Sequence, residues 1–266
     1  MKDKKEELKQ LVDKYTFFPE KDFKDHFMNA ARDIGPSRKL LGNVDVLVFY
    51  VDDAVSKWTE TDKLAFQKAL VKGLNLINDA AKLRCTNLKF RVASCHTTVD
   101  FTVDVDNDNV GMLMKKYNKK NAGEYQTFYE EKYNVDEAPV ILAVNKMMRS
   151  FAGETRDYIP NKDEYSVVGK SRRGLFNHTV LAHELLHQFG AQDYYYPQEV
   201  RDAASKYLPG SIMDSGSDID SVTRWAIGWS DCFFADKEAY SFFEATSHIT
   251  TDVLIKAREA EWKKWK

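Results

Sequence analysis

The chain has 266 residues, of which 43% are hydrophobic, with 39 Lys and Arg against 41 Asp and Glu and a formal net charge of −2. This length and apolar content suffice for one large domain, or for one domain with extensions. The balanced charge argues against a nucleic-acid or membrane-surface partner, and no apolar run is long enough to span a membrane. The sequence therefore predicts a globular chain with neither kind of partner.

The chain as given begins with a charged stretch, residues 1–7, and no apolar segment follows it. A secretory signal peptide needs such a segment. We therefore expect a cytoplasmic protein by default, or a secreted one if a leader has been removed. The three cysteines, Cys85, Cys95 and Cys232, are few and odd in number. This count favours reduced thiols over a disulfide scaffold, and pairing of Cys85 with Cys95 stays open.

Residues 1–43 are expected to form an N-terminal helical arm. Apolar residues at helical spacing predict an amphipathic helix over 3–15, and an apolar-rich segment then continues until Gly35-Pro36 breaks it. The arm is either a propeptide or an extra layer on the following domain. A propeptide that acts through a cysteine is excluded, because no cysteine precedes Cys85. We favour the structural layer, since the arm carries no recognisable inhibitory element.

Strands and helices alternate through the next part of the chain. Residues 44–51 are a near-continuous apolar run, which predicts a strand buried on both faces. Thr59 opens a capping-type pattern, from which a helix runs to about Arg84. The acidic stretch 104–109 lacks the glycine and the closing glutamate of an EF-hand, and we interpret it as a solvated turn. The other expected elements before residue 170 are a strand over 88–103, one or two helices over 112–133, and strands over 139–144 and 165–169.

The most informative stretch is His183-Glu184-x-x-His187. Positions four apart lie on one face of a helix, so the two imidazoles can point at one place. Neutral imidazole is a good zinc ligand, and a catalytic zinc usually takes three protein ligands and leaves one position for water. Gly190 can end the helix in a left-handed conformation, and Asp193 can then swing back as the third ligand. Glu184 would accept a proton from the bound water.

The bare motif also occurs by chance, in helices whose histidines are solvated or hydrogen-bonded. The glycine and the aspartate that follow at fixed spacing argue against chance here. The segment also carries the apolar face that a core helix needs, made of Val180, Leu181, Leu185 and Leu186. His178 lies off the ligand face, so we expect it to be structural or exposed.

This pattern resembles the metzincin clan of zinc metallopeptidases. Most members have histidine as the third ligand, and Asp193 resembles the variant found in the snapalysin-like branch. That branch often carries a tyrosine two residues past the aspartate, which is Tyr195 in this sequence. Met213, within Ser-Ile-Met-Asp-Ser-Gly at 211–216, is similar to the methionine turn that lies beneath the metal in this clan. The motifs cover residues 178–216.

The resemblance implies an α+β (α/β) fold of the metzincin-like zincin type. We expect a twisted mixed sheet of about five strands, with an antiparallel edge strand within 147–158, an active-site helix and a mainly helical C-terminal subdomain. The catalytic domain would span 44–266, divided into 44–190 and 191–266. In its C-terminal part, helices are expected over 217–229, 236–246 and 251–265.

The implied function is that of a zinc endopeptidase. One catalytic Zn²⁺ would be held by His183, His187 and Asp193, and Glu184 would act as general base and acid. Tyr195 is a candidate donor to the oxyanion or to the zinc-bound water. Tyr194, Tyr195 and Tyr196 can all line the cleft, and aromatic packing at a surface loop is the alternative that stays open. The substrate would be a peptide or protein bound in extended form along the edge strand, by a monomeric enzyme.

Two alternatives remain open at this point. The chain can be a scaffold that binds peptides without cutting them, although such a protein has no need of Glu184. It can also hydrolyse a non-peptide amide, because that reaction needs the same activated water.

Overall fold

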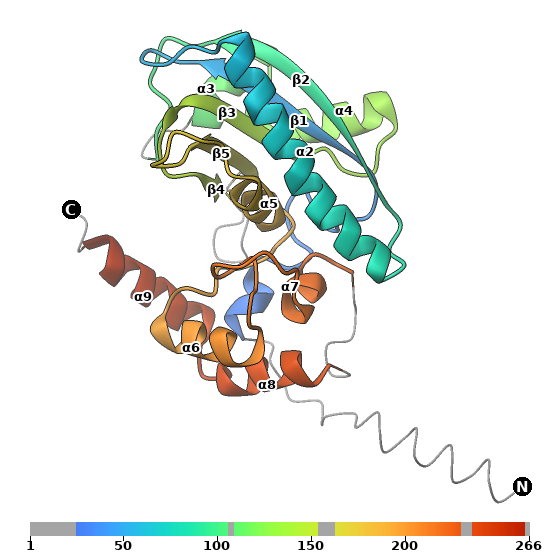
Figure 1. The fold of residues 1–266 in the computed structure, drawn as a ribbon, viewed down its shortest axis with the longest axis vertical. Coiled ribbons are helices and arrows are strands. Elements are labelled where there is room, and N and C mark those ends of the chain that lie inside the picture. Colours follow the sequence, from blue (N-terminus) through green and yellow to red (C-terminus); the bar gives the residue numbers. More distant parts are fainter. Residues whose placement is uncertain (1–24, 106–108, 154–162, 230–235, 264–266) are drawn as a thin grey trace, which may run out of the picture.

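The computed structural model describes residues 25–105, 109–153, 163–229 and 236–263. An upper part holds a twisted sheet with helices on both faces, and a lower part is built of short helices (Figure 1). The helix of the His-Glu-x-x-His motif, α5 (His178–His187), lies between the sheet and the lower part. The predicted site is therefore at the junction of the two parts.

The sheet has five strands in the order β2-β1-β3-β5-β4. The strands are β1 (Gly42–Asp52), β2 (Leu88–Thr98), β3 (Val140–Met147), β4 (Phe151–Gly153) and β5 (Tyr165–Lys170). β1 pairs in parallel with β2 and β3, β3 pairs in parallel with β5, and the edge strand β4 runs antiparallel to β5. The expected α+β class, with a five-stranded mixed sheet and an antiparallel edge strand, is thus confirmed. Within the window 147–158, residues 154–158 lie outside the described residues.

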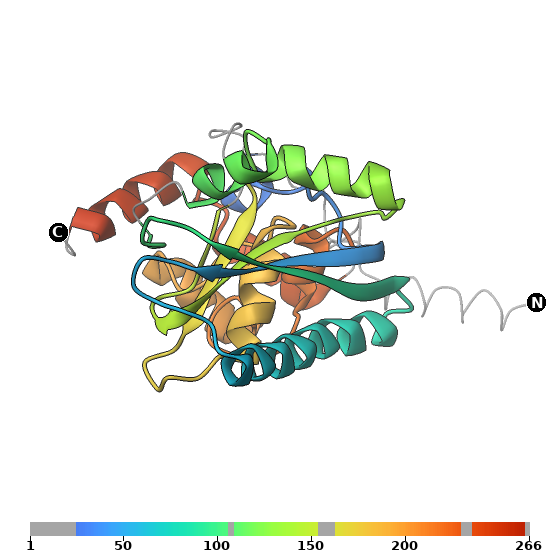
Figure 2. The same ribbon diagram turned by 90° about the horizontal axis from the view of Figure 1, so that it is seen from above.

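Both faces of the sheet are covered, as the apolar run 44–51 predicts, since every residue of that run is buried. Alternate side chains of a strand point to opposite faces. Val46 and Val48 enter the core cluster that includes α2 (Glu60–Leu83) and α5, while Leu47 and Phe49 enter a second cluster on the other face. That second face is covered by α3 (Asn109–Met114), η2 (Lys115–Tyr117) and α4 (Ala122–Tyr133). Figure 2 shows α2 and α4 on opposite sides of the sheet.

The lower part is mainly helical, as expected. Its helices are α6 (Gln198–Tyr207), α7 (Ser221–Ala226), α8 (Lys237–Ala245) and α9 (Thr251–Lys263). The single turn η1 (Phe27–Ala30) from the start of the described chain lies among them (Figure 1). The amide of Phe27 donates to the Ile249 carbonyl at 3.2 Å, and the Arg32 guanidinium lies 4.5 Å from the centre of the Trp225 ring. The boundaries at 43 and 191 stay predictions, and the helix expected over 3–15 lies outside the described residues.

Two expected elements end earlier or start later than their patterns indicate. The strand expected over 88–103 ends at Thr98, because the following residues bend back over the end of β1. The amide of Val99 donates to the Asp52 carbonyl at 2.8 Å, and the amide of Val103 donates to the Asp53 carboxylate at 3.0 Å. Both valines are buried in the loop, so their alternation reflects core packing rather than a strand.

The helix expected over 217–229 is shorter, since α7 begins only after Asp220. The Asp220 carboxylate accepts hydrogen bonds from the amides of Val222 and Thr223, both at 2.9 Å, which caps the helix there. The amides of Ser217 and Asp218 instead donate to the Gly210 carbonyl. The helix α6 was not expected from the sequence at all.

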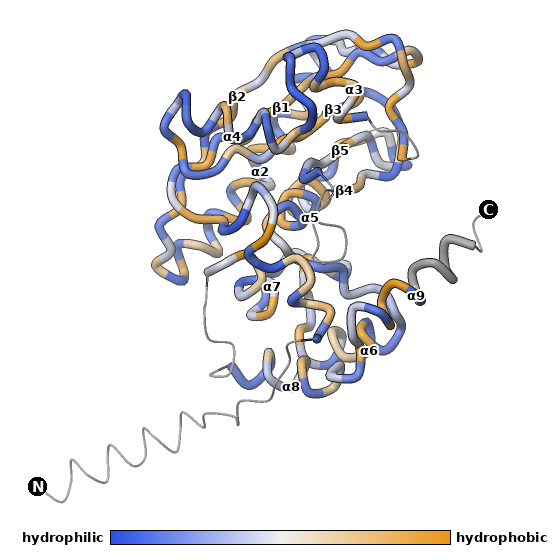
Figure 3. Tube along the Cα trace, turned by 180° about the vertical axis from the view of Figure 1, so that it is seen from behind, coloured by the Kyte–Doolittle hydropathy of each residue, from blue (hydrophilic) through white to orange (hydrophobic). Residues whose placement is uncertain are grey.

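The hydropathy of the chain follows these layers, with apolar segments inside the sheet and polar ones along the outer helices and loops (Figure 3). Among the described helices, none combines the length and apolar character needed to cross a membrane. Cys85 and Cys95 are free thiols, which confirms the expectation for these two, while Cys232 lies outside the described residues.

A half-buried carboxyl group, that of Glu137, joins the loop before β3 to the chain that enters β1. Its Oε1 accepts the amide of Lys39 at 3.5 Å, and its Oε2 is buried without a donor in the described chain. Burial, with repulsion from Glu130 as the next cause, raises the pKa of Glu137 to about 8. The folded state therefore holds a proton on this side chain that the unfolded state releases above about pH 4.5.

We predict that Glu137→Gln stabilises the protein at pH 8 and has little effect at pH 5. Because the pKa is raised in the folded state, the stability that Glu137 contributes is present below the unfolded pKa and is lost as the pH rises towards 8. Glutamine keeps an acceptor for the Lys39 amide and cannot ionise. Urea unfolding of both proteins across this pH range measures the effect. An equal change in unfolding free energy at pH 5 and pH 8 would show that ionisation is not its cause.

Candidate metal centre

The helix α5 is fixed on the sheet by polar side chains as well as by its apolar face. The Gln188 side chain accepts the Val140 amide at 3.0 Å and donates to the Val140 carbonyl at 3.2 Å and to the Ser166 hydroxyl at 2.8 Å. Ser166 in turn donates to the carbonyl of Glu184 at 2.8 Å. These bonds join the last turn of α5 to β3 and β5, so the backbone of the motif is held directly against the sheet.

Neither Gln188 nor Ser166 was singled out from the sequence. Both are fully buried polar residues in otherwise apolar surroundings. The available signal was weak: a glutamine within the run that ends Leu-Leu-His-Gln-Phe, and a serine at the start of a buried strand. Such residues are recognised as anchors only when their backbone partners are known, because a buried polar group needs a partner.

The chain turns sharply after α5, as Gly190 predicts. Gly190 has a φ of +93°, in the left-handed region, and a Cβ at this position would lie 2.6 Å from the carbonyl oxygen of Ala31. The amide of Ala191 then donates to the Leu186 carbonyl at 3.2 Å, and the amide of Tyr194 donates to the Met213 carbonyl at 2.8 Å. Asp193 therefore lies between two residues with hydrogen-bonded amides, Ala191 and Tyr194, and it faces α5.

Three ligand atoms meet at this point. The Nε2 atoms of His183 and His187 are 3.0 Å apart. The Oδ1 atom of Asp193 lies 3.2 Å from the first and 3.1 Å from the second. The three residues that the sequence predicts as metal ligands are therefore brought together, with their ligand atoms at the corners of a nearly equilateral triangle.

The other nitrogen of each imidazole determines what this triangle can bind. Nδ1 of His183 is 2.8 Å from the Ile212 carbonyl oxygen, and Nδ1 of His187 is 2.7 Å from the Ala191 carbonyl oxygen. A carbonyl oxygen only accepts, so each Nδ1 must carry the hydrogen. In the neutral tautomer both Nε2 atoms then present lone pairs. Two nitrogen lone pairs and a carboxylate oxygen thus face one another, and they need a cation or a proton between them.

In the absence of a metal, protons can take this role. Burial alone would raise the pKa of Asp193, but His187 and His183 hold it well below its usual value. Burial likewise opposes the charge on His187, and Asp193 nevertheless raises the pKa of that imidazole. Asp193 is therefore ionised, and its Oδ1 finds no hydrogen-bond donor in the described chain when the imidazoles are neutral.

A divalent ion also fits the separations in this donor set. Ligand atoms about 2.0–2.1 Å from a tetrahedral zinc lie roughly 3.3 Å apart, close to the observed separations. His183, Glu184 and His187 also offer ligand atoms that lie within 4.8 Å of one another, which makes a second possible trio. Asp193 Oδ1 lies at 3.2 and 3.1 Å from the two nitrogens. Its role as the third ligand stays the prediction made from the sequence.

Glu184 lies beside this triangle and is almost entirely buried, with 7% of its surface exposed. Burial raises the pKa of its carboxyl, and the neighbouring His183 and His187 oppose that shift. The side chain lines the same cavity as His183. A carboxyl group with a raised pKa at the wall of a cavity is suited to accept and return a proton.

Of the three consecutive tyrosines, Tyr195 lines the cavity. Its ring is stacked on that of His183 at a centroid distance of 6.4 Å, and burial followed by Asp193 raises its pKa, so the phenol keeps its proton. Tyr194 and Tyr196 are not among the residues that line the cavity, and for these two the alternative of packing holds. Tyr194 is fully buried and its hydroxyl is 3.2 Å from that of Thr223, while the Tyr196 hydroxyl donates to the carbonyl of Ala257.

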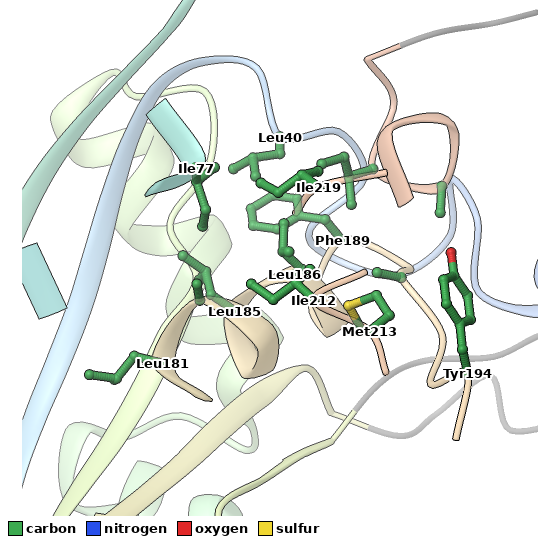
Figure 4. Close-up of a cluster of buried hydrophobic side chains, with 14 of the residues drawn as sticks. Leu40, Ile77, Leu181, Leu185, Leu186, Phe189, Tyr194, Ile212, Met213 and Ile219 are labelled. Carbon is green, nitrogen blue, oxygen red and sulfur yellow. The ribbon is translucent and has the colours of Figure 1, made fainter. Parts of the chain in front are cut away.

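Met213 is fully buried among Leu186, Phe189 and Ile212 (Figure 4). Its amide is 3.1 Å from the Ser211 hydroxyl oxygen, and that hydroxyl donates to Asp220 at 2.6 Å. The segment thus supplies the Ile212 carbonyl to His183 and the Met213 carbonyl to Tyr194. Its assignment as a methionine turn stays a prediction.

The site opens into a cavity of about 970 Å³. Its walls are formed by the turn between β3 and β4, the loop before α5, the exposed side of α5 and the segment after Met213. The cavity is large enough for several residues of a peptide or for a small molecule.

No protein-family model matches the chain, and no curated protein matches it by sequence. Among solved structures, metalloproteinase-II from Bacteroides fragilis is similar with a TM-score of 0.40 and 10% sequence identity, over 80% of this chain and 59% of that chain. The matched region thus spans less than two thirds of that protein. A likeness this distant adds nothing to the assignment of the site, which depends on the geometry above.

We predict that Gly190→Ala lowers the free energy of unfolding by about 2–4 kcal/mol, because it adds both a left-handed non-glycine residue and a clash with the Ala31 carbonyl. Gly174→Ala is the matched control: its φ is +72°, and nothing lies within 4 Å of the added Cβ. It should cost about 1 kcal/mol. Urea unfolding measures both variants, and equal losses would contradict the proposed packing of residues 31–32 beneath the site.

We also predict that zinc stabilises the protein after treatment with a chelator. A ligand at 100 times its Kd stabilises a folded protein by about 2.7 kcal/mol, which corresponds to a rise in Tm of roughly 5 °C or more for a chain of this size. Asp193→Ala should lose most of this rise, whereas the exposed control Asp202→Ala should keep it. Differential scanning fluorimetry with and without zinc checks this, and a full shift in Asp193→Ala would exclude that residue as a ligand.

Proposed function

We propose that the protein is a zinc-dependent endopeptidase. The observation that carries this proposal is the convergence of His183 Nε2, His187 Nε2 and Asp193 Oδ1 at 3.0–3.2 Å, with both Nδ1 atoms already bonded to carbonyl oxygens. His183, His187 and Asp193 would hold a zinc ion by three protein ligands, the number that leaves a catalytic zinc one position for water. A zinc ion held there would lower the pKa of a water molecule and polarise a substrate carbonyl.

The chain's own residues would then move the protons. Glu184 would take the proton from the attacking water on its carboxylate and pass it to the nitrogen of the leaving amine. Its burial favours the protonated form that the second step requires, and the nearby imidazoles favour the ionised form that the first step requires. The protonated phenol of Tyr195 can donate a hydrogen bond to the oxygen on which negative charge develops.

The sheet offers a place for an extended substrate. β4 is the last strand on its side of the sheet, so one row of its amides and carbonyls is not paired within the described sheet. Residues 147–150, which lead into β4, line the cavity that holds Glu184. A peptide that pairs with this edge would pass over the site with its backbone aligned. An extended peptide is therefore the substrate that we propose over a compact amide.

The test of this proposal is Glu184→Gln. We predict that the variant binds one equivalent of zinc, as the unaltered protein does, while its turnover of an unfolded protein substrate falls by a factor of about 10² to 10⁴. Zinc content by elemental analysis and cleavage by mass spectrometry are the two measurements, with chelator-treated protein as the inactive reference. Full activity in Glu184→Gln would end this mechanism. Zinc binding without any cleavage by the unaltered protein would favour a non-cleaving scaffold.

A further inference from the structure

Two arginines line the cavity that holds the candidate metal site. Arg149 lies in the turn between β3 and β4, and Arg172 lies in the loop between β5 and α5. Both side chains are exposed. In the part of the chain that the structure describes, neither forms an ion pair with a carboxylate.

Basic residues near the ends of the adjoining strands β3 and β5 are paired with carboxylates. Lys146 of β3 lies 2.6 Å from a carboxylate oxygen of Asp53, and Lys170 of β5 lies 2.8 Å from one of Asp62. Both of these cations are therefore committed to structural contacts. Arg149 and Arg172 differ from these two lysines, since neither has a carboxylate partner in the described chain. Their two guanidinium groups are therefore available to a ligand.

The cavity also contains an acid, which bears on its net charge. Asp214, directly after Met213, also lines the cavity, and its carboxylate is 3.7 Å from Arg201. This acid is partly compensated by a residue that does not line the cavity. Apart from the metal site and Glu184, the walls therefore carry an excess of positive charge.

Arg149 lines the same cavity as Glu184 and Tyr195. A ligand that fills this cavity can therefore contact the guanidinium and reach these two side chains at once.

We propose that Arg149, assisted by Arg172, binds a carboxylate of the substrate beside the reacting amide. The reaction at this amide rests on the proposed function, whereas the binding of the carboxylate does not. A guanidinium group forms paired hydrogen bonds with a carboxylate in a fixed planar geometry, which gives specificity as well as affinity. The carboxylate can come from an acidic side chain or from a free C-terminus, since both present the same group.

Binding can be measured without turnover in zinc-loaded Glu184→Gln. The probes are three sets of fluorescent peptides. In the first set, a glutamate is placed at each position in turn and the C-terminus is amidated. The second set has glutamine in place of the glutamate, and the third set is the glutamine set with a free C-terminus. We expect the glutamate peptides, or the free C-terminus, to bind about five- to tenfold more tightly than amidated glutamine peptides at low salt. The difference should shrink as the salt concentration rises.

Arg149→Gln in the same background should abolish this preference, and Arg172→Gln should reduce it. The matched control is Arg173→Gln, because Arg173 is exposed, adjacent in the chain and not part of the cavity lining. It should leave the preference intact. Equal binding of glutamate, glutamine and free-end peptides would overturn the proposal, and so would a preference that persists in Arg149→Gln.

The same peptides, incubated with the unaltered zinc-loaded protein, separate this inference from the proposed function. If the carboxylate preference in binding is present but no peptide is cleaved, the recognition by Arg149 stands and the peptidase assignment fails. If peptides are cleaved with equal kcat/KM and bind without a preference, the peptidase assignment stands and the role of Arg149 is refuted.

Discussion

The site depends on one electrostatic constraint: three hydrogen-bond acceptors face one another inside the protein. The two imidazole Nδ1 atoms are bonded to backbone carbonyls at 2.8 and 2.7 Å, so in the neutral tautomers the Nε2 atoms direct lone pairs at each other and at Asp193. Acceptors at 3.0–3.2 Å repel unless a positive charge lies between them. The rest of the fold must stabilise this arrangement of three acceptors. The contacts near the site hold the three side chains in place.

These supports come from four separate regions of the chain. Gln188 and Ser166 join α5 to the sheet, and the segment at 211–213 provides the carbonyl that orients His183. The carbonyl of Ala31 lies where a side chain at Gly190 would otherwise be. The described N-terminal residues are therefore part of the structure beneath the turn that leads to the aspartate, and the left-handed glycine is required by close packing as well as by the direction of the turn.

The sequence predicted the convergence of three side chains better than it predicted the bounds of the elements around them. The meeting of His183, His187 and Asp193 could be predicted, because residue spacing on a helix and a glycine-dependent turn are local properties. The buried strand β1 was equally clear, since all its central residues are apolar. The end of β2 could not be predicted, because Val99 and Val103 are buried by a loop rather than by a ladder. The separate roles of Tyr194, Tyr195 and Tyr196 depend on contacts with Thr223, Asp193 and Ala257, which lie up to 61 positions away in the sequence.

The most direct test of the central claim is X-ray absorption spectroscopy at the zinc edge on the purified, zinc-loaded protein. The account predicts a single site with two imidazole nitrogens and light-atom oxygen ligands at about 2.0–2.1 Å, and a change in this first shell when Asp193 is replaced by alanine. A zinc shell without paired imidazole scattering, or one that is unchanged by the loss of Asp193, would contradict it.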